Sequence, residues 1–170
     1  HPHVLTLGRN GHMENILLSV ERLSELGIEF FESDRGGDIT YHGPGQNVGY
    51  PIIDLRDWKR DVVAYVRGIE EVVIETLRQF GIEGSRDPGA TGVWTPEGKI
   101  CAIGVHISRW VSTHGFALNW TTDLEYFRYI VPFITQFWMF ATPVAYSSTL
   151  LSEPWRTLYG LNPMVGVIEG

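Results

Sequence analysis

Cysteine and positive charge are both scarce in this sequence of 170 residues. Its single cysteine, Cys101, excludes an internal disulfide framework and fits a reducing compartment, so we expect a cytoplasmic protein. Lysine and arginine together number 13 against 20 aspartates and glutamates, which gives a net charge of −7. Nucleic-acid phosphates are generally bound by a basic face, and the sequence therefore predicts no nucleic-acid partner.

Internal repeats and low-complexity segments are also missing, and the length suits one domain with a sizeable core. The sequence does not begin with methionine, and residues 1–8 resemble a loop that runs into a strand, so we expect a chain truncated at its start. From Tyr129 to Ser152 no residue is charged, whereas charges punctuate everything before. This aromatic-rich window has the length of a membrane span, although Pro132 and Pro143 make it an imperfect one.

Glycine, by contrast, is concentrated beside hydrogen-bonding side chains in residues 35–46, Arg-Gly-Gly-Asp-Ile-Thr-Tyr-His-Gly-Pro-Gly-Gln. Gly36 and Gly37 can take positive φ or let a ligand approach the backbone closely. The alternation that follows predicts a short strand over 39–42, and Pro44 between two glycines predicts a turn. Such a segment typically wraps around a ligand; the alternative is a tight polar hairpin without a chemical role.

Hydrophobic periodicity predicts the other elements. Apolar residues recur at helical spacing within 57–80, where we expect the longest helix, and Ser19 caps a shorter helix that ends near Leu26. Residues 92–94 and 99–105 predict a hairpin, and 84–92 a loop. Further strands are expected over residues 4–8, 28–33, 47–55 and 116–120. Pro51 within 47–55 indicates a strand at a sheet edge or a bulge. Hairpins crossed by a few helices indicate an α+β fold with mixed α/β layers.

Several of these segments, in this order and spacing, resemble the lipoyl(octanoyl) transferases. The resemblance covers residues 1–132 and implies the fold shared by biotin and lipoate protein ligases. The segments that carry it are residues 35–46, Gly49-Tyr-Pro51, Gly92-Val-Trp94, Lys99-Ile-Cys-Ala-Ile-Gly104, His114-Gly-Phe-Ala-Leu-Asn119, Thr122-Asp-Leu124 and Ile130-Val-Pro132.

The resemblance implies transfer of an octanoyl group from acyl carrier protein to a lysine of lipoyl domains, through a thioester on an enzyme cysteine. The acceptors would be the lipoyl domains of 2-oxoacid dehydrogenases and the glycine cleavage H protein, and neither a cofactor nor a metal is implied. Lys99 would lower the pKa of the nucleophilic thiol. The residues implied around the acyl substrate are Arg35, Gly36, Gly37, Asp38, Ile39, Thr40, Tyr41, His42, Ala102, Ile103, Gly104, Gly115, Phe116 and Ala117.

Elementary chemistry supports these roles. Thioester exchange needs a thiolate, and a nearby ammonium favours ionisation of the thiol. Backbone N–H groups in glycine-rich segments can stabilise the developing oxyanion. An octanoyl tail also needs an apolar tunnel, for which we expect Ile103, Val105, Phe116 and Leu118 to be the walls. The alternatives are an ordinary exposed lysine at 99 and structural histidines at 42 and 114.

The sequence departs from the family at the nucleophile. Family members continue Ile-Val-Pro with Cys-Gly-Ile, but Phe133 follows Pro132 here, and a phenyl ring cannot form a thioester. Cys101 lies two residues after Lys99 on a predicted strand, and we expect it to be a buried core residue. The octanoyltransferase activity is therefore expected to be lost or impaired. A non-catalytic module that binds an acyl group or a lipoyl domain, and an ATP-dependent lipoate ligase, remain alternatives.

Residues 133–170 form a hydrophobic tail foreign to the family. They resemble a fragment of an ABC-type exporter permease, near a late membrane helix and a Leu-Asn-Pro loop. We therefore expect two parts, an incomplete octanoyltransferase-like domain over 1–132 and a permease-like tail, joined by gene rearrangement or faulty sequence assembly. Membrane association would be possible only through this tail. The alternatives are a membrane component defined by the tail and a buried C-terminal helix that replaces the family's own.

Overall fold

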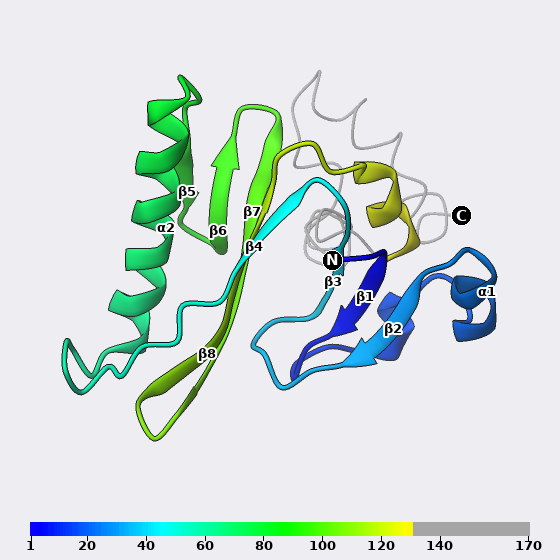
Figure 1. Cartoon of the computed structure of the whole chain (residues 1–170), viewed down its shortest axis with the longest axis horizontal. Helices are drawn as coiled ribbons and strands as arrows, with labels where there is room; N and C mark the ends of the chain where they lie inside the picture. The colour runs from blue at the N-terminus through cyan, green and yellow to red at the C-terminus, as the bar shows by residue number, and fades with distance from the viewer. Residues whose placement is uncertain (131–170) are drawn as a thin grey trace, which may run out of the picture. The chain divides into compact units, whose positions relative to one another are not determined.

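A computed structural model of the chain describes residues 1–130 (Figure 1). Phe133 and the tail predicted for 133–170 lie outside the described residues, so their expected roles stay predictions. Within residues 1–130 no helix is both long and apolar enough to cross a membrane.

A three-stranded sheet with strand order β2-β1-β3 is built from the first part of the chain. Strand β2 runs parallel to β1, and β3 pairs with β1 in the antiparallel direction. One face of this sheet buries an apolar cluster with Leu5, Leu23 and Tyr41 at its centre. The elements of this part are β1 (Val4–Leu7), η1 (Met13–Asn15), α1 (Val20–Glu25), β2 (Glu29–Glu32), β3 (Ile39–His42) and η2 (Leu124–Tyr129).

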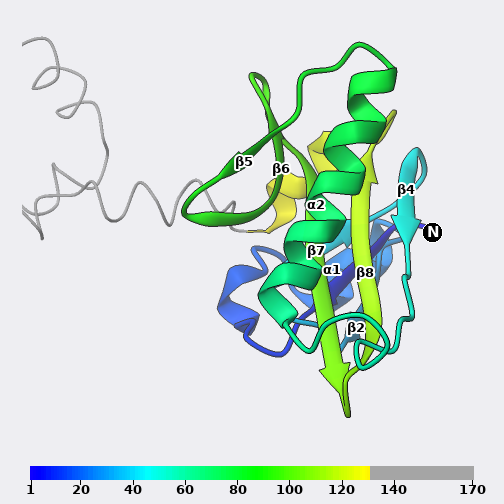
Figure 2. The same ribbon diagram turned by 90° about the vertical axis from the view of Figure 1, so that its left-hand side faces the viewer.

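A five-stranded antiparallel sheet follows, with strand order β4-β8-β7-β6-β5. Its centre is the long β7–β8 ladder, in register from Cys101 opposite Leu118 to Ser108 opposite Val111. The helix α2 (Val62–Gln79) lies along one face of this sheet over β6 and β7 (Figure 2). The strands are β4 (Gln46–Gly49), β5 (Ser85–Asp87), β6 (Ala90–Thr95), β7 (Gly98–Ser108) and β8 (Val111–Asn119).

The amphipathic pattern of α2 explains how it packs. Tyr65, Ile69, Val73 and Leu77 recur at helical spacing and are buried, so they form one stripe against the sheet. The helix begins later than the sequence predicts, because the Asp61 carboxylate accepts a hydrogen bond from the Ala64 backbone N–H and caps the helix there.

The α+β prediction is confirmed, and so are most of the predicted elements. Ser19 caps α1 as expected, with its hydroxyl accepting a bond from the Arg22 N–H. Strand β4 lies at a sheet edge as predicted, but it ends at Gly49, before Pro51, which cannot donate to a ladder. The loop predicted for 84–92 is wrong, because β5 and the start of β6 pair there as a hairpin. Strand β8 is also longer than expected.

Candidate functional site

The β7–β8 ladder presents side chains of very different size on its two faces. Directly opposite residues of an antiparallel pair share a face. Gly104 lies opposite Gly115 and Ala102 opposite Ala117, which gives one face only hydrogen or methyl side chains at these four positions. The three-stranded sheet lies on the opposite side of β7 and β8 from α2 (Figure 1), and this alanine–glycine face is turned toward it.

The segment that contains Arg35, Gly36 and Gly37 crosses this face at close range. The Gly36 N–H donates to the Val105 carbonyl oxygen at 3.0 Å. A Cβ added at Gly104 would lie 2.6 Å from the Gly36 oxygen and 3.4 Å from Arg35 Cδ. Because that oxygen belongs to the backbone, no side-chain rotation could relieve the clash. Glycine at 104 is therefore required by the approach of the Arg35–Gly37 segment.

Arg35 is 9% exposed and ties this segment to β1. Its Nη2 donates to the Thr6 carbonyl at 2.5 Å and to Thr6 Oγ1 at 2.9 Å, and its Nη1 donates to the Gly36 carbonyl at 3.1 Å. Burial lowers the pKa of the guanidinium, and the Asp38 carboxylate opposes that shift. These hydrogen bonds fix the position of the segment, and the guanidinium gives it a positive charge.

Asp38 fixes the other end of the segment through hydrogen bonds. Its carboxylate accepts hydrogen bonds from the Asn15 side-chain amide, from its neighbour Ile39 N–H at 2.7 Å and from the His12 N–H at 3.3 Å. These contacts join the segment to η1. Asp38 therefore positions the candidate site through the backbone, and its oxygens are already engaged.

A cluster that the sequence reasoning missed anchors the segment on the ladder. The Asp34 carboxylate accepts hydrogen bonds from His106 Nδ1 on β7 at 2.5 Å and from His114 Nε2 on β8 at 2.6 Å. The two histidines hold the pKa of Asp34 at about 2. His114 adopts a φ of 59°, a conformation that histidine visits more readily than bulky residues do. In the sequence, the only sign of this cluster is that Asp34 stands directly before Arg35.

The polar face of the three-stranded sheet supplies the opposite wall. Thr6 lies opposite Thr40, and both share a face with His42. Ile39 and Tyr41 alternate to the other face, where they pack in the apolar cluster, and burial raises the pKa of Tyr41 to about 12. Of the residues predicted around the substrate, these two therefore contribute only backbone to the site.

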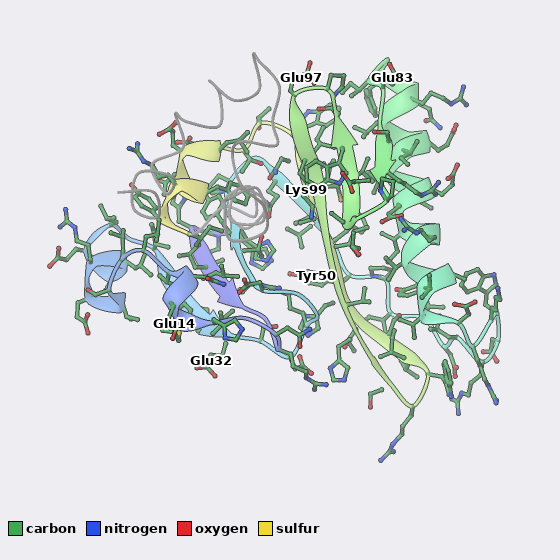
Figure 3. The ribbon with its side chains drawn as sticks, turned by 180° about the vertical axis from the view of Figure 1, so that it is seen from behind. Glu14, Glu32, Tyr50, Glu83, Glu97 and Lys99 are labelled. Carbon is green, nitrogen blue, oxygen red and sulfur yellow. The ribbon has the colours of Figure 1, made fainter. Side chains whose placement is uncertain are left out.

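Lys99 and Cys101 lie near the β6–β7 hairpin, whose tip carries Glu97 (Figure 3). The Lys99 Nζ lies 5.4 Å from the centre of the Trp94 ring, and burial of this end of the side chain lowers its pKa. Its Cε also passes so close to Gly92 that an added Cβ there would lie 2.6 Å away. While it is protonated, the Lys99 ammonium would favour ionisation of a thiol brought close to it.

Cys101 is fully buried in the cluster beneath α2, which confirms the prediction of a core residue. Burial raises the pKa of its thiol to about 12, so the thiol is protonated and poorly nucleophilic at neutral pH.

The four side chains predicted to be tunnel walls lie on the α2 side of the ladder. The side chains of Ile103, Val105, Phe116 and Leu118 pack in the apolar clusters beneath α2, on the face that bears Cys101. Ile103 and Phe116 keep a place in the site only through the backbone of the β7–β8 ladder. The alternation of strand side chains, which groups these residues correctly, cannot tell which of two faces a helix will cover.

Together the two sheets and their helices form an α+β domain with mixed α/β layers, the fold of lipoate protein ligases. A bi-partite lipoate protein ligase from Thermoplasma acidophilum shares this fold with a TM-score of 0.63 at 19% identity, over 76% of this chain and 50% of that one. The family model for the lipoyl protein ligase A/B catalytic domain matches residues 1–138. The chain belongs to this family.

Curated relatives add a finer similarity. An octanoyltransferase from Solibacter usitatus is 67% identical over 132 residues, which cover 78% of this chain and 60% of that protein. One from Flavobacterium johnsoniae is 53% identical over 137 residues, covering 78% of this chain and 59% of that protein. The chain thus spans about 60% of the length of these relatives.

Proposed function

We propose that residues 1–132 bind a medium-chain acyl group, octanoyl or lipoyl, against the alanine–glycine face of β7–β8. The single observation that carries this is the Arg35–Gly37 segment, which is held 3.0 Å from the ladder backbone at a face without large side chains. The methyl side chains of Ala102 and Ala117 flank the place where this segment crosses the ladder, and an acyl group bound there would lie beside backbone N–H groups. The partners would be octanoyl-acyl carrier protein and lipoyl domains, as the octanoyltransferase relatives suggest, and the location cytoplasmic.

We further propose that the covalent step of an octanoyltransferase is lost or impaired in this chain. Phe133 occupies the position where the family carries its cysteine, and a phenyl ring offers no nucleophile. Cys101 does not replace it, because its thiol is buried and its pKa is raised to about 12.

Incubation with octanoyl-acyl carrier protein, followed by intact mass measurement, tests both proposals. The unsubstituted chain and a Cys101→Ser variant should form no hydroxylamine-labile octanoyl adduct, whereas Phe133→Cys should form one. An adduct on the unsubstituted chain that disappears in Cys101→Ser would overturn the loss of the covalent step. Absence of an adduct on Phe133→Cys would overturn the octanoyltransferase assignment.

A non-catalytic role is favoured by Phe133 at the position of the family's cysteine, because a phenyl ring supplies no nucleophile. Titration of the chain with octanoate, followed by calorimetry, measures this function directly. Binding by the unsubstituted chain without adduct formation would support an acyl-binding module, and absence of binding would overturn it.

For residues 133–170 we propose an origin separate from the family domain, as a permease-like segment joined near Pro132. The support is the uncharged composition from Tyr129 to Ser152 and the departure from the family sequence after Pro132. Sequencing of genomic DNA across the codon for Pro132 tests whether the join is real. An unbroken reading frame from residue 132 into residues 133–170 would remove faulty assembly as the explanation, whereas a frame that continues into a family-like Cys-Gly-Ile would remove gene rearrangement.

A further inference from the structure

Gln46 of β4 has an amide whose orientation is fixed by its neighbours. The amide nitrogen lies 3.3 Å from the Tyr41 carbonyl oxygen and 2.9 Å from Asn119 Oδ1, and the amide oxygen lies 2.8 Å from His42 Nδ1. A backbone carbonyl can only accept a hydrogen bond, so the group facing Tyr41 is the NH₂. The oxygen of Gln46 therefore faces His42, and His42 Nδ1 must carry the proton that it donates.

This arrangement leaves His42 with an open acceptor. A neutral imidazole protonated at Nδ1 has a lone pair at Nε2. Nε2 makes no hydrogen bond with any residue in the described range, and the side chain is only partly buried. His42 also lies on the strand face that carries Thr40, the face on which Thr6 binds Arg35. The open lone pair thus belongs to the wall of the candidate site.

The surroundings of His42 keep the ring neutral. Burial lowers its pKa, and the positive charge of Arg35 lowers it further, while the bond to Gln46 opposes the shift. The His1 ring lies 5.5 Å away, centre to centre. The ring is therefore neutral at neutral pH, and the lone pair of Nε2 is available to accept a proton.

We infer that His42 Nε2 accepts the proton of the lysine ε-ammonium that receives the acyl group, with Gln46 and Asn119 as positioning residues. This inference rests on the proposed function. An ammonium has no lone pair, so the lysine must lose a proton before it attacks. Its nitrogen then forms a C–N bond to the carbonyl of the thioester, either that of octanoyl-acyl carrier protein or that of the adduct on a Phe133→Cys variant, and the C–S bond breaks. The thiolate leaves with the second proton of that nitrogen as the thiol, and the proton on His42 passes to solvent.

The tautomer can be measured in the unsubstituted chain. Long-range ¹H–¹⁵N NMR spectra should show, beside His106, which donates from Nδ1 to Asp34, a histidine in the Nδ1–H form whose signals disappear in His42→Asn. Gln46→Leu should shift that histidine toward the commoner Nε2–H form, and the exposed His12 serves as the reference ring within each spectrum. An Nε2–H tautomer at His42 in the unsubstituted chain would overturn the inference.

Kinetics in the Phe133→Cys background separate acyl loading from acyl transfer. Once the octanoyl adduct has formed, His42→Asn should pass it to a lipoyl domain roughly 10²- to 10⁴-fold more slowly, the usual range for general base catalysis, and this loss should exceed any loss in the rate of loading. Lys99→Met should instead slow adduct formation. Unchanged transfer in His42→Asn, or a loss confined to loading, would overturn the role of His42. Failure of Phe133→Cys itself to load would overturn the proposed function and this role with it, so the two failures are distinguishable.

Discussion

The two faces of the β7–β8 ladder are built from the same two strands but differ in what packs against them. Toward α2 the ladder presents Cys101, Ile103, Phe116 and Leu118, which fill apolar clusters with the helix. Toward the three-stranded sheet it presents only alanine and glycine at the facing positions, and the backbone of the Arg35–Gly37 segment comes within hydrogen-bonding distance. The face toward α2 is packed with large side chains, whereas the other face carries none at these four positions.

Because of this difference, we expect one face of the strand pair to determine stability and the other to determine binding. The α2 face should determine the free energy of unfolding, because its side chains bury apolar area. The alanine–glycine face should determine whether the Arg35–Gly37 segment and an acyl group can lie against the sheet. Substitutions on adjacent residues, which point to opposite faces, should therefore affect different measurements.

The largest effect is expected from Leu118→Ala on the α2 face. Leu118 is 6% exposed and lies opposite Cys101, so truncation leaves a cavity and should lower the free energy of unfolding by about 2–5 kcal/mol. Urea denaturation measures the loss. Octanoate affinity per folded molecule should stay within about twofold, since the side chain points away from the candidate site.

Leu124→Ala is the matched control for that substitution. Leu124 is 59% exposed, and removing the same atoms there should change stability by less than about 0.5 kcal/mol. Equal losses for the two variants, or a loss of octanoate binding in Leu118→Ala alone, would contradict the division between the faces.

A smaller effect on stability and a larger one on binding are expected from Gly104→Ala. The added Cβ meets the Gly36 oxygen at 2.6 Å, so the Arg35–Gly37 segment must move, at a cost of roughly 1–3 kcal/mol. Calorimetric titration with octanoate should show weaker binding as the segment shifts. Gly68→Ala, inside α2, is the control: its nearest neighbour would be Trp58 at 4.0 Å, and it should stabilise the helix by about 0.5–1 kcal/mol.

Much of the fold follows from local sequence signals. Ser19 caps α1 where it was expected, the apolar stripe of α2 ends before Gly81, and the polar alternation around Thr40 marks β3. These features depend on residues a few positions apart. The Arg35–Gln46 run likewise predicted the loop, strand and turn that the structure contains, because glycine and proline restrict the backbone locally.

The parts that could not be predicted depend on contacts between distant segments. Asp34 meets His106 and His114 across 72 and 80 residues of sequence, a meeting that requires the β7–β8 register and the path of the preceding loop. Alternation predicts that Ile103 and Val105 share one face of β7, and likewise Phe116 and Leu118 on β8, but it does not show that α2 covers that face. Both faces of β7 are at least partly buried, so hydrophobicity alone does not identify the one beneath α2.

The smallest effect is expected at the edge of the alanine–glycine face, in Asp34→Asn. The pKa of Asp34 is lowered from 3.8 to about 2 in the folded protein, so its carboxylate stabilises the fold above pH 4 and this contribution is lost as the pH falls from about 4 toward 2. The variant should therefore lose less stability than the unsubstituted chain over that interval. Thermal unfolding at pH 6 and at pH 2.5 measures the difference.

Asp54→Asn is the matched comparison for Asp34→Asn, because the pKa of Asp54 is also lowered to about 2, here by Arg56 two residues away in the same loop. Both variants should flatten the acid dependence to a similar extent. Only Asp34→Asn should weaken octanoate binding at pH 7, because Asp34, unlike Asp54, joins the Arg35 segment to the histidines of β7 and β8. Equal binding by the two variants would mean that the segment keeps its place on the ladder without the histidine contacts, through the Gly36 hydrogen bond and Arg35.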